Sequence, residues 1–235
     1  RLSLGLGDVY KRQLVEAMPL LKELVKRVEA SDNSEIKLDF PIFLIGTGHI
    51  QQYIASKQTN ELSEALRWYD RLEKEFPNSP KIKDMLFKRI DVLRALSNNN
   101  EAIELMQKIL SGGYKNVRLS QSEQTKLLKD LTQIYYSTGQ LSAGLPYFGQ
   151  LFEIARNPED QALAAAASFE ALFQAERLDD ALNLLPGLAK ESAVRYRPRL
   201  NVALLKASDK LVEVGRVNDA ALTLNLIKTT DIMIK

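Results

Sequence analysis

Apolar side chains recur every three to four positions over most of this chain, which is the period of an amphipathic α-helix. The first such stretch starts at Leu14 and continues through Met18, Leu21, Val25 and Val28, with charged side chains between them. The sequence therefore predicts an amphipathic helix at the start of the folded part of the chain.

The segment after this helix is less regular. Small polar residues at 31–34 predict a break, because such side chains hydrogen-bond their own backbone. Residues 36–40 alternate like a strand, whereas the sequence from Ile42 onward is compatible with a short helix. We predict a helix from about residue 42.

The rest of the chain repeats itself. Five short polar turns each precede a small residue, called an anchor here, that opens an amphipathic helix. The anchors are Ala65, Ala102, Gly144, Ala181 and Ala220, and the steps between them are 37 to 42 residues long. The residues four positions after the anchors are Tyr69, Met106, Phe148, Leu185 and Leu224, and those seven after are Leu72, Ile109, Leu151, Leu188 and Ile227. All ten are apolar, so one helix face recurs with the anchors.

A second helix face recurs in the same frame. Nine residues before the last four anchors lie Leu93, Tyr135, Leu172 and Leu211, and sixteen before lie Leu86, Leu128, Ala165 and Leu204. Turns at 98–100, 139–140, 176–177 and 215–216 separate the two faces, and Gly and Asn in such turns suit the left-handed conformation that ends a helix. Each unit is therefore predicted to be a helix, a tight turn and a second helix.

These units resemble the tetratricopeptide repeat (TPR), which has a small anchor and an aromatic residue in its second helix. The matching residues of one unit are Leu131, Tyr135, Gly139, Gly144 and Phe148, and those of another are Ala65, Tyr69, Leu72 and Pro77. The likeness covers about residues 42–232, but the steps exceed the usual ~34 residues and the first helices lack Trp, so the units are divergent. The resemblance implies an all-α fold, a TPR-like α-solenoid of about five antiparallel helix pairs that forms a right-handed superhelix.

A weaker resemblance concerns one junction. Phe76-Pro77-Asn78-Ser79-Pro80 is similar to junctions in bacterial envelope-type TPR proteins, namely the outer-membrane assembly lipoprotein and the TolA-associated coordinator. The alternative is that this segment simply stops one helix and starts the next. The compartment therefore stays open between the cytoplasm and the bacterial periplasm or cell envelope.

The sequence also predicts how the chain is divided. Residues 1–13 resemble translated sequencing-adaptor sequence and are expected to be an adaptor-derived or disordered terminus. Residues 14–60 are expected to form a helical flank with the first helix of the first repeat, and 61–235 the repeat array, all within a single solenoid domain, 14–235. Both ends look like cuts in a longer reading frame, so the chain is expected to be a fragment of a larger protein.

Composition narrows the chemistry. The chain has no Cys, which excludes disulfides, thiolate zinc sites and cysteine nucleophiles, and its only His is His49. The 32 basic and 30 acidic residues nearly balance, so no nucleic-acid partner is predicted. No apolar run approaches the ~20 residues of a membrane-spanning helix.

Gly46-Thr47-Gly48 suggests a dinucleotide-binding loop, but Gln51 stands where that motif needs a third glycine. We predict no catalytic residue, no cofactor and no metal, and therefore no enzyme; oligomeric state is not predicted.

The predicted function is protein–protein interaction, because first helices of such arrays line a concave groove. The expected partner is a protein or a peptide. The residues expected to face it are Phe87, Asp91, Arg94, Lys129, Gln133, Tyr136, Glu170, Phe173 and Gln174. The residues expected to pack the repeats are Ala65, Tyr69, Ala102, Tyr135, Gly144, Phe148, Ala181 and Ala220. Two alternatives stay open: a platform region of a larger enzyme or envelope-assembly factor whose catalytic or anchoring part lies outside this chain, and a structural spacer with a polar concave face.

Overall fold

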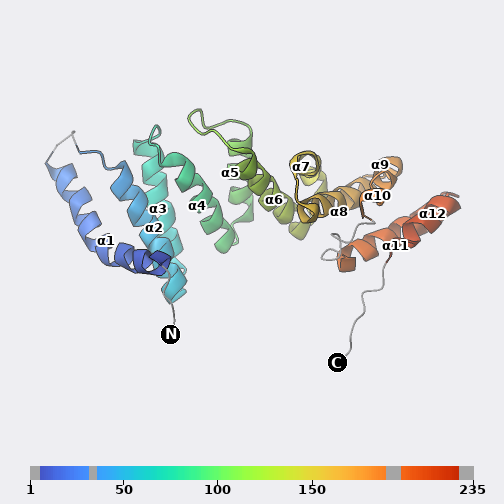
Figure 1. Cartoon of the computed structure of the whole chain (residues 1–235), viewed down its shortest axis with the longest axis horizontal. Coiled ribbons are helices and arrows are strands. Elements are labelled where there is room, and N and C mark those ends of the chain that lie inside the picture. Colours follow the sequence, from blue (N-terminus) through green and yellow to red (C-terminus); the bar gives the residue numbers. More distant parts are fainter. Residues whose placement is uncertain (1–5, 32–35, 189–196, 228–235) are drawn as a thin grey trace, which may run out of the picture. The chain divides into compact units, whose positions relative to one another are not determined.

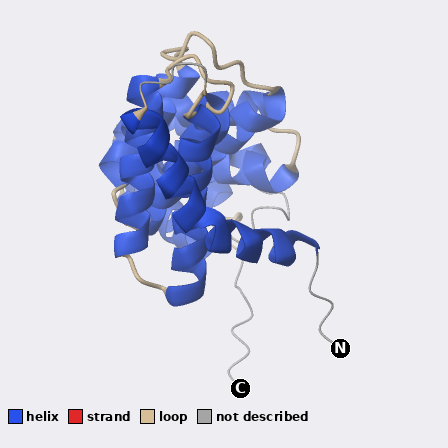
Figure 2. Cartoon of the chain, turned by 90° about the vertical axis from the view of Figure 1, so that its left-hand side faces the viewer, coloured by secondary structure: helices blue, strands red, loops and turns tan. Residues whose placement is uncertain are grey.

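The computed structural model describes residues 6–31, 36–188 and 197–227, and all regular secondary structure in these ranges is α-helical (Figures 1 and 2). The chain forms two compact units, Arg1–Arg118 (unit 1) and Leu119–Lys235 (unit 2). The predicted all-α class is confirmed. A single solenoid domain over 14–235 stays a prediction.

The described residues of unit 1 form five helices that pack in chain order. They are α1 (Leu6–Ala30), α2 (Asp39–Ser56), α3 (Asn60–Glu75), α4 (Ile82–Ala95) and α5 (Asn99–Leu110). Each helix contacts the next one, and α2 also contacts α4. The contact of α2 with α4 is the one expected when the first helices of successive pairs stack on each other.

The beginning of unit 1 differs from the sequence prediction at two places. Residues 6–13 are helical rather than disordered, because nothing from Asp8 to Gln13 breaks a helix that continues to Ala30. The second helix begins at Asp39, three residues before the predicted start, and the strand-like residues before Phe40 form no strand. Pro41 lies in the first turn of α2, where its missing N–H group has no helical partner to lose.

A close contact joins α2 to α3. A Cβ atom at Gly46 would lie 2.8 Å from Cδ1 of Tyr69, so the absence of a side chain at Gly46 lets the two helices approach. The Tyr69 ring is fully buried, and its hydroxyl lies 3.2 Å from Oγ1 of Thr47. Trp68 lies beside it on α3, half-buried, with the guanidinium of Arg71 5.5 Å from its ring centre.

In unit 2, residues 119–188 and 197–227 form three helix pairs. They are α6 (Gln121–Thr138) with α7 (Leu141–Ile154), α8 (Pro158–Gln174) with α9 (Leu178–Leu182) and α10 (Leu185–Leu188), and α11 (Arg197–Glu213) with α12 (Val217–Leu224). Helix α6 begins with a capping box in which Ser120 and Glu123 bond each other's backbone N–H groups. Helix α8 contacts α6, α7, α9, α10 and α11, so it is the centre of this unit.

The helix that pairs with α8 is interrupted. Residues 183–184 form a turn between α9 and α10. Pro186 explains the break, because it has no N–H group and its ring clashes with the carbonyl group of Leu182 in a continuous helix. The sequence pattern predicts one helix here.

The turns inside the pairs share one backbone conformation. Four of them place a residue with positive φ five positions before the anchor, and these residues are Ser97, Gly139, Glu176 and Gly215. Glycine adopts this left-handed conformation without strain at two of the four positions. Between α4 and α5 the left-handed residue is Ser97, which lies one position before the predicted turn at 98–100.

The five anchors are buried: Ala65, Ala102, Gly144, Ala181 and Ala220. The aromatic residues expected to pack beside them, Tyr69, Tyr135 and Phe148, are buried as well. The last pair differs in one respect. Leu224 is 44% exposed although its equivalents in the other pairs are buried, because no helix of the described part of the chain follows α12 to cover it.

Candidate functional site

A pocket lies between the first helices of the last two pairs of unit 2. It has a volume of about 260 Å³ and is called the α8–α11 pocket here. Its lining residues are Glu170, Phe173 and Gln174 from α8 and Val202, Ala203 and Lys206 from α11. The three α8 residues are spaced by one to four positions, so helical periodicity turns them toward the same side of the helix. This pocket thus brings together three of the nine residues predicted to face a partner.

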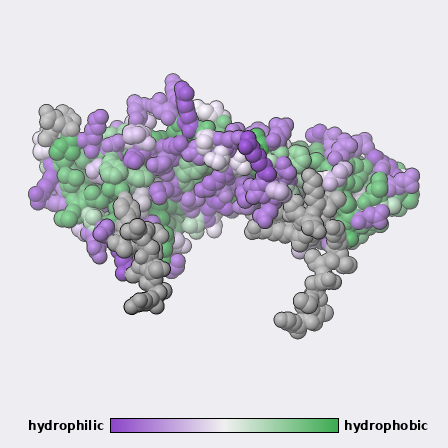
Figure 3. All heavy atoms as spheres, viewed as in Figure 1, coloured by the Kyte–Doolittle hydropathy of each residue, from purple (hydrophilic) through white to green (hydrophobic). Residues whose placement is uncertain are grey.

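The walls of the α8–α11 pocket are mainly apolar. Phe173 packs against the hydrophobic core of unit 2, which fixes its ring, and Val202 is 53% exposed. Leu205 and Val212 extend the exposed apolar stripe along α11. Hydrophobic side chains are visible at the surface around α11 and α12 (Figure 3). Glu170 and Lys206 add one charge of each sign.

The other predicted partner-facing residues lie elsewhere. Lys129 is on α6, and its Nζ is 2.6 Å from Oδ1 of Asp160 on α8. Gln133 is half-buried on α6. Phe87, Asp91 and Arg94 are on α4 in unit 1, where Asp91 is exposed and the other two are half-buried.

Tyr136 requires a correction. It is only 7% exposed and is not part of an open face. The physical reason is that α6 packs against both α7 and α8, so two neighbours cover the helix face that the sequence pattern left open. Tyr136 therefore contributes to the core of unit 2.

Three lining residues were not predicted: Val202, Ala203 and Lys206. The projection that nominated partner-facing residues used the first helices α4, α6 and α8 and was not extended to α11. In the same repeat frame it gives Leu205, Asp209 and Val212, which are all exposed on α11. None of these three lines the pocket, so the repeat pattern indicates that α11 has an exposed face but does not identify Val202, Ala203 or Lys206.

No protein-family profile matches this chain, and no curated protein matches its sequence. Solved structures do match its backbone. The crystal structure of YrrB, a TPR protein with an unusual peptide-binding site, is 19% identical and aligns over 86% of this chain and 89% of its own length, with a TM-score of 0.51.

The fold is that of a divergent TPR-like array.

A second similar structure is a putative kinesin light chain from Podosopora anserina with nearly identical TPR-like repeats. It is 16% identical and covers 76% of this chain and 87% of its own length, with a TM-score of 0.49.

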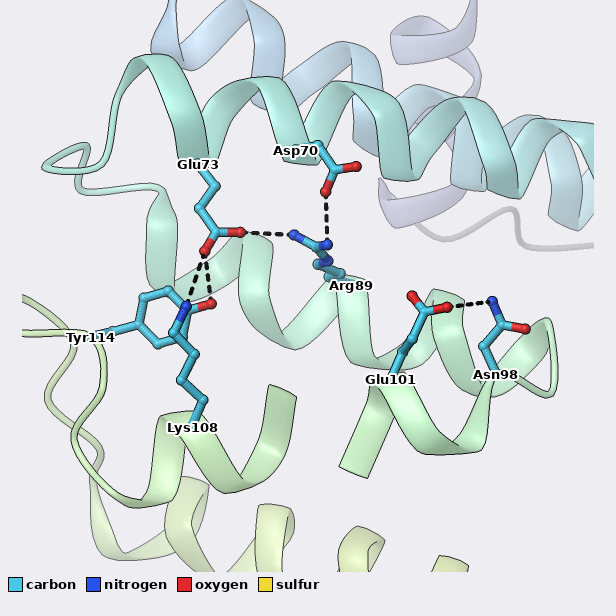
Figure 4. A network of polar contacts seen from close by, with 7 residues as sticks. All are labelled: Asp70, Glu73, Arg89, Asn98, Glu101, Lys108 and Tyr114. Atoms are coloured by element: carbon cyan, nitrogen blue, oxygen red, sulfur yellow. Dashed lines mark hydrogen bonds and ion pairs between the residues drawn. The ribbon is translucent and has the colours of Figure 1, made fainter. Parts of the chain in front are cut away.

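A network of charged side chains connects three helices of the TPR-like unit 1 (Figure 4). Arg89 of α4 is its centre, with Nη2 2.7 Å from Oδ1 of Asp70 and Nη1 2.8 Å from Oε2 of Glu73, both on α3. Tyr114, on the connection after α5, donates its hydroxyl hydrogen to Oε1 of Glu73 at 2.8 Å. Nζ of Lys108 on α5 lies 4.4 Å from the centre of the Tyr114 ring. Glu73 therefore ties α3 to α4 and to the connection after α5.

The environment of Tyr114 stabilises its neutral form. Burial raises the pKa of its phenol, the hydrogen bond to the Glu73 carboxylate raises it further, and the charge of Arg89 acts in the opposite direction. The protonated hydroxyl is the form that can donate to Glu73, so this connection is made below the pKa of Tyr114.

We expect the two acids that hold Arg89 to differ in their contribution to stability. Glu73→Ala removes the contacts with Arg89 and Tyr114, and its side chain is only 27% exposed, so unit 1 should lose about 1–2 kcal/mol of unfolding free energy. Asp70→Ala is the matched control: its side chain is 58% exposed, and a solvent-exposed ion pair contributes at most about 0.5 kcal/mol. Urea denaturation followed by circular dichroism measures both, and equal losses would contradict the assignment.

The only histidine joins two helices. Nδ1 of His49 on α2 lies 2.6 Å from Oε2 of Glu61 on α3, and His49 is 5% exposed. His49 is buried and Glu61 is half-buried, so this contact joins α2 to α3.

In the ranges 6–31, 36–188 and 197–227, no group of three His, Asp or Glu side chains is placed to hold a metal ion. Within the same ranges, no helix has the length and apolarity needed to span a membrane.

Proposed function

We propose that this chain is a non-enzymatic scaffold that binds a peptide or a helix of a partner protein, with the α8–α11 pocket as the main anchoring site. The observation that carries the proposal is that Glu170, Phe173 and Gln174 line one pocket together with the exposed side chain of Val202. The proposal assigns no catalytic residue, cofactor or metal to the chain.

The physical chemistry of the α8–α11 pocket supports a peptide ligand. A volume of about 260 Å³ is small for a cofactor but sufficient for one large apolar side chain. Exposed apolar side chains that lie together on a surface favour a partner because their burial removes apolar area from water. Glu170 and Lys206 offer a carboxylate and an ammonium group beside the apolar walls, which orients a ligand. We therefore expect a segment with one bulky apolar residue flanked by polar or charged residues.

The comparison with YrrB supports the same class of function. That protein has a peptide-binding site, and its backbone resembles this chain over most of both lengths. A shared fold alone does not establish a shared ligand. The proposal therefore depends on the α8–α11 pocket and uses the likeness as support.

The proposal is tested by selecting peptides from a random displayed library with the whole chain and measuring their affinities by surface plasmon resonance. We expect the selected peptides to share an apolar residue. Val202→Glu should weaken their binding about tenfold or more, because a bound apolar side chain would have to displace water from the new carboxylate, even where that carboxylate pairs with Lys206 one turn along α11. Val202 is half exposed, so this change should leave the fold intact.

Val217→Glu is the matched control, because Val217 is another exposed valine of unit 2 and does not line the pocket. Binding by this variant should stay within about twofold of the unchanged chain, since a distant surface charge is screened by salt. Failure to select any peptide, or equal binding by both variants, would refute the proposed site.

A further inference from the structure

The last helix pair of unit 2, α11 with α12, has an apolar side, and no helix of the described part of the chain follows α12 to cover it (Figure 1). Leu205 and Val212 lie on α11, two turns apart and therefore on one side of that helix, and both are exposed. Leu224 is the last residue of α12 and is also exposed. These three residues are called the terminal face here.

The preceding pair shows what covers such a side. At positions 181 and 220, the last two anchors are 39 residues apart. The same step relates the terminal face to its equivalents in the preceding pair, which are Ala166, Phe173 and Leu185. Ala166 and Leu185 are buried in the hydrophobic core that α8 and α10 share with α11, and Phe173 packs against this core. The side of the preceding pair that corresponds to the terminal face is therefore covered by a helix, α11.

Helix α11 covers that side with a stripe of leucine and alanine, which consists of Leu200, Ala203, Leu204 and Ala207. These positions have the three-to-four spacing of an amphipathic helix. The terminal face suits a helix of the same kind. Its Leu205 is larger than the equivalent Ala166, its Val212 is smaller than the equivalent Phe173, and leucine stands at the third position in both pairs. The terminal face thus corresponds, residue by residue, to a surface on which a helix is observed.

Charged residues beside the terminal face follow the same correspondence. Glu170 of α8 and Lys206 of α11 line the α8–α11 pocket together. The equivalent of Glu170 in the last pair is Asp209, which is exposed on α11 one turn after Leu205. A helix that covers the terminal face as α11 covers the preceding pair would bring a residue at the Lys206 position beside Asp209. Charge complementarity therefore favours a helix with lysine at this position.

We propose that the terminal face binds an amphipathic α-helix of a partner protein, in the way that α8 and α10 hold α11. The partner helix carries leucine and alanine at three-to-four spacing and a lysine that lies beside Asp209. Its binding removes the apolar surface of Leu205, Val212 and Leu224 from water. Leu205 is about 200° around α11 from Ala203, which lines the α8–α11 pocket, so the two surfaces lie on different sides of the helix. This inference does not depend on peptide binding in that pocket.

The test uses the whole chain and, as a probe, a fluorescently labelled synthetic peptide with the sequence of α11, residues 197–213, titrated by fluorescence anisotropy. We expect saturable binding at one site per chain. The ellipticity of the mixture at 222 nm should exceed the sum of the separate components, because an isolated helix of this length is marginal in water and the bound peptide is helical. Leu204→Asn in the peptide should abolish binding, because Leu204 belongs to the buried stripe.

Leu224→Glu in the chain should weaken peptide binding about tenfold or more, because the apolar stripe of the peptide would have to displace water from the new carboxylate. Leu222→Glu is the matched control on the same helix. Leu222 is 58% exposed and lies about 160° around α12 from Leu224, so its effect should stay within about twofold. Val212→Glu is a second test variant on α11, where the side chain is exposed and the change should leave the fold intact.

Three results would overturn the proposal. The first is the absence of saturable peptide binding. The second is equal binding by Leu222→Glu and the two test variants, because the peptide would then bind elsewhere. The third is a dimer of the chain alone in analytical ultracentrifugation that Val212→Glu dissociates, because a second copy and not a partner helix would then occupy the terminal face.

Discussion

Replacing Gly144 by Ala should destabilise unit 2 by about 1–3 kcal/mol, because the added methyl group has no room. A Cβ atom at Gly144 would lie 2.8 Å from Cβ of Tyr135 on α6 and 2.6 Å from Cε1 of Phe148. The Tyr135 atom is attached directly to the backbone of α6, so it cannot move without moving that helix. Phe148 is fully buried, which restricts its ring as well. We expect a lower urea midpoint by circular dichroism, with the melting temperature of unit 2 falling by about 4 °C per kcal/mol.

Gly149 provides the matched control on the same helix. A Cβ atom at Gly149 meets no atom within 4 Å, and the residue is exposed. Gly149→Ala should therefore raise the unfolding free energy by about 0.5–1 kcal/mol, because Ala loses less backbone entropy in a helix than Gly does. The two variants make the same chemical change on α7 and should shift stability in opposite directions. A loss at both positions, or at neither, would refute the role of Gly144 as a point of close helix contact.

Unit 1 should lose stability steeply in alkali. Burial raises the pKa of the Tyr69 phenol, and its hydrogen bond with Thr47 only partly opposes this shift. The pKa of Tyr114 is raised as well. In the unfolded chain both phenols ionise near pH 10. A phenol whose folded pKa is raised stabilises the fold fully below about pH 10, and this contribution is lost as pH rises toward the folded pKa.

The expected size follows from linkage. For each such phenol the unfolding free energy should fall by up to about 1.4 kcal/mol per pH unit above about pH 10. Urea denaturation of the whole chain between about pH 9 and about pH 11.5 measures the slope. Tyr69→Phe and Tyr114→Phe each remove one ionising group, so each should flatten the slope, whatever its effect at neutral pH. Tyr53→Phe is the control, because Tyr53 is half-buried and reaches the surface beside Lys57. An unchanged slope in both test variants would contradict the prediction.

Sequence periodicity predicted the parts of this fold that depend on a repeated contact. Ala65 and Ala102 stand out because a small residue is needed wherever two helices of a pair approach closely, and that need recurs in every pair. Periodicity failed for Tyr136, because it shows which helix face is apolar but not how many neighbours cover the remaining face. It also missed the break between α9 and α10, although Pro186 was a local signal for it.

The candidate sites were only partly predictable for a related reason. Glu170 and Phe173 follow from projecting a first helix away from its core, whereas the same projection on α11 gives no residue that lines the pocket. The network of Glu73, Arg89 and Tyr114 joins side chains from two helices and a connection, and charged residues there follow no period.

The single tryptophan gives the chain an intrinsic optical reporter for half of the molecule. Trp68 is on α3 in unit 1, and its ring lies against the charged group of Arg71, so its emission should change when that helix loses its contacts. The residues of unit 2 contribute no indole. Emission therefore follows the melting of the first half alone while far-ultraviolet ellipticity follows both, and a difference between the two curves measures how independently the halves unfold.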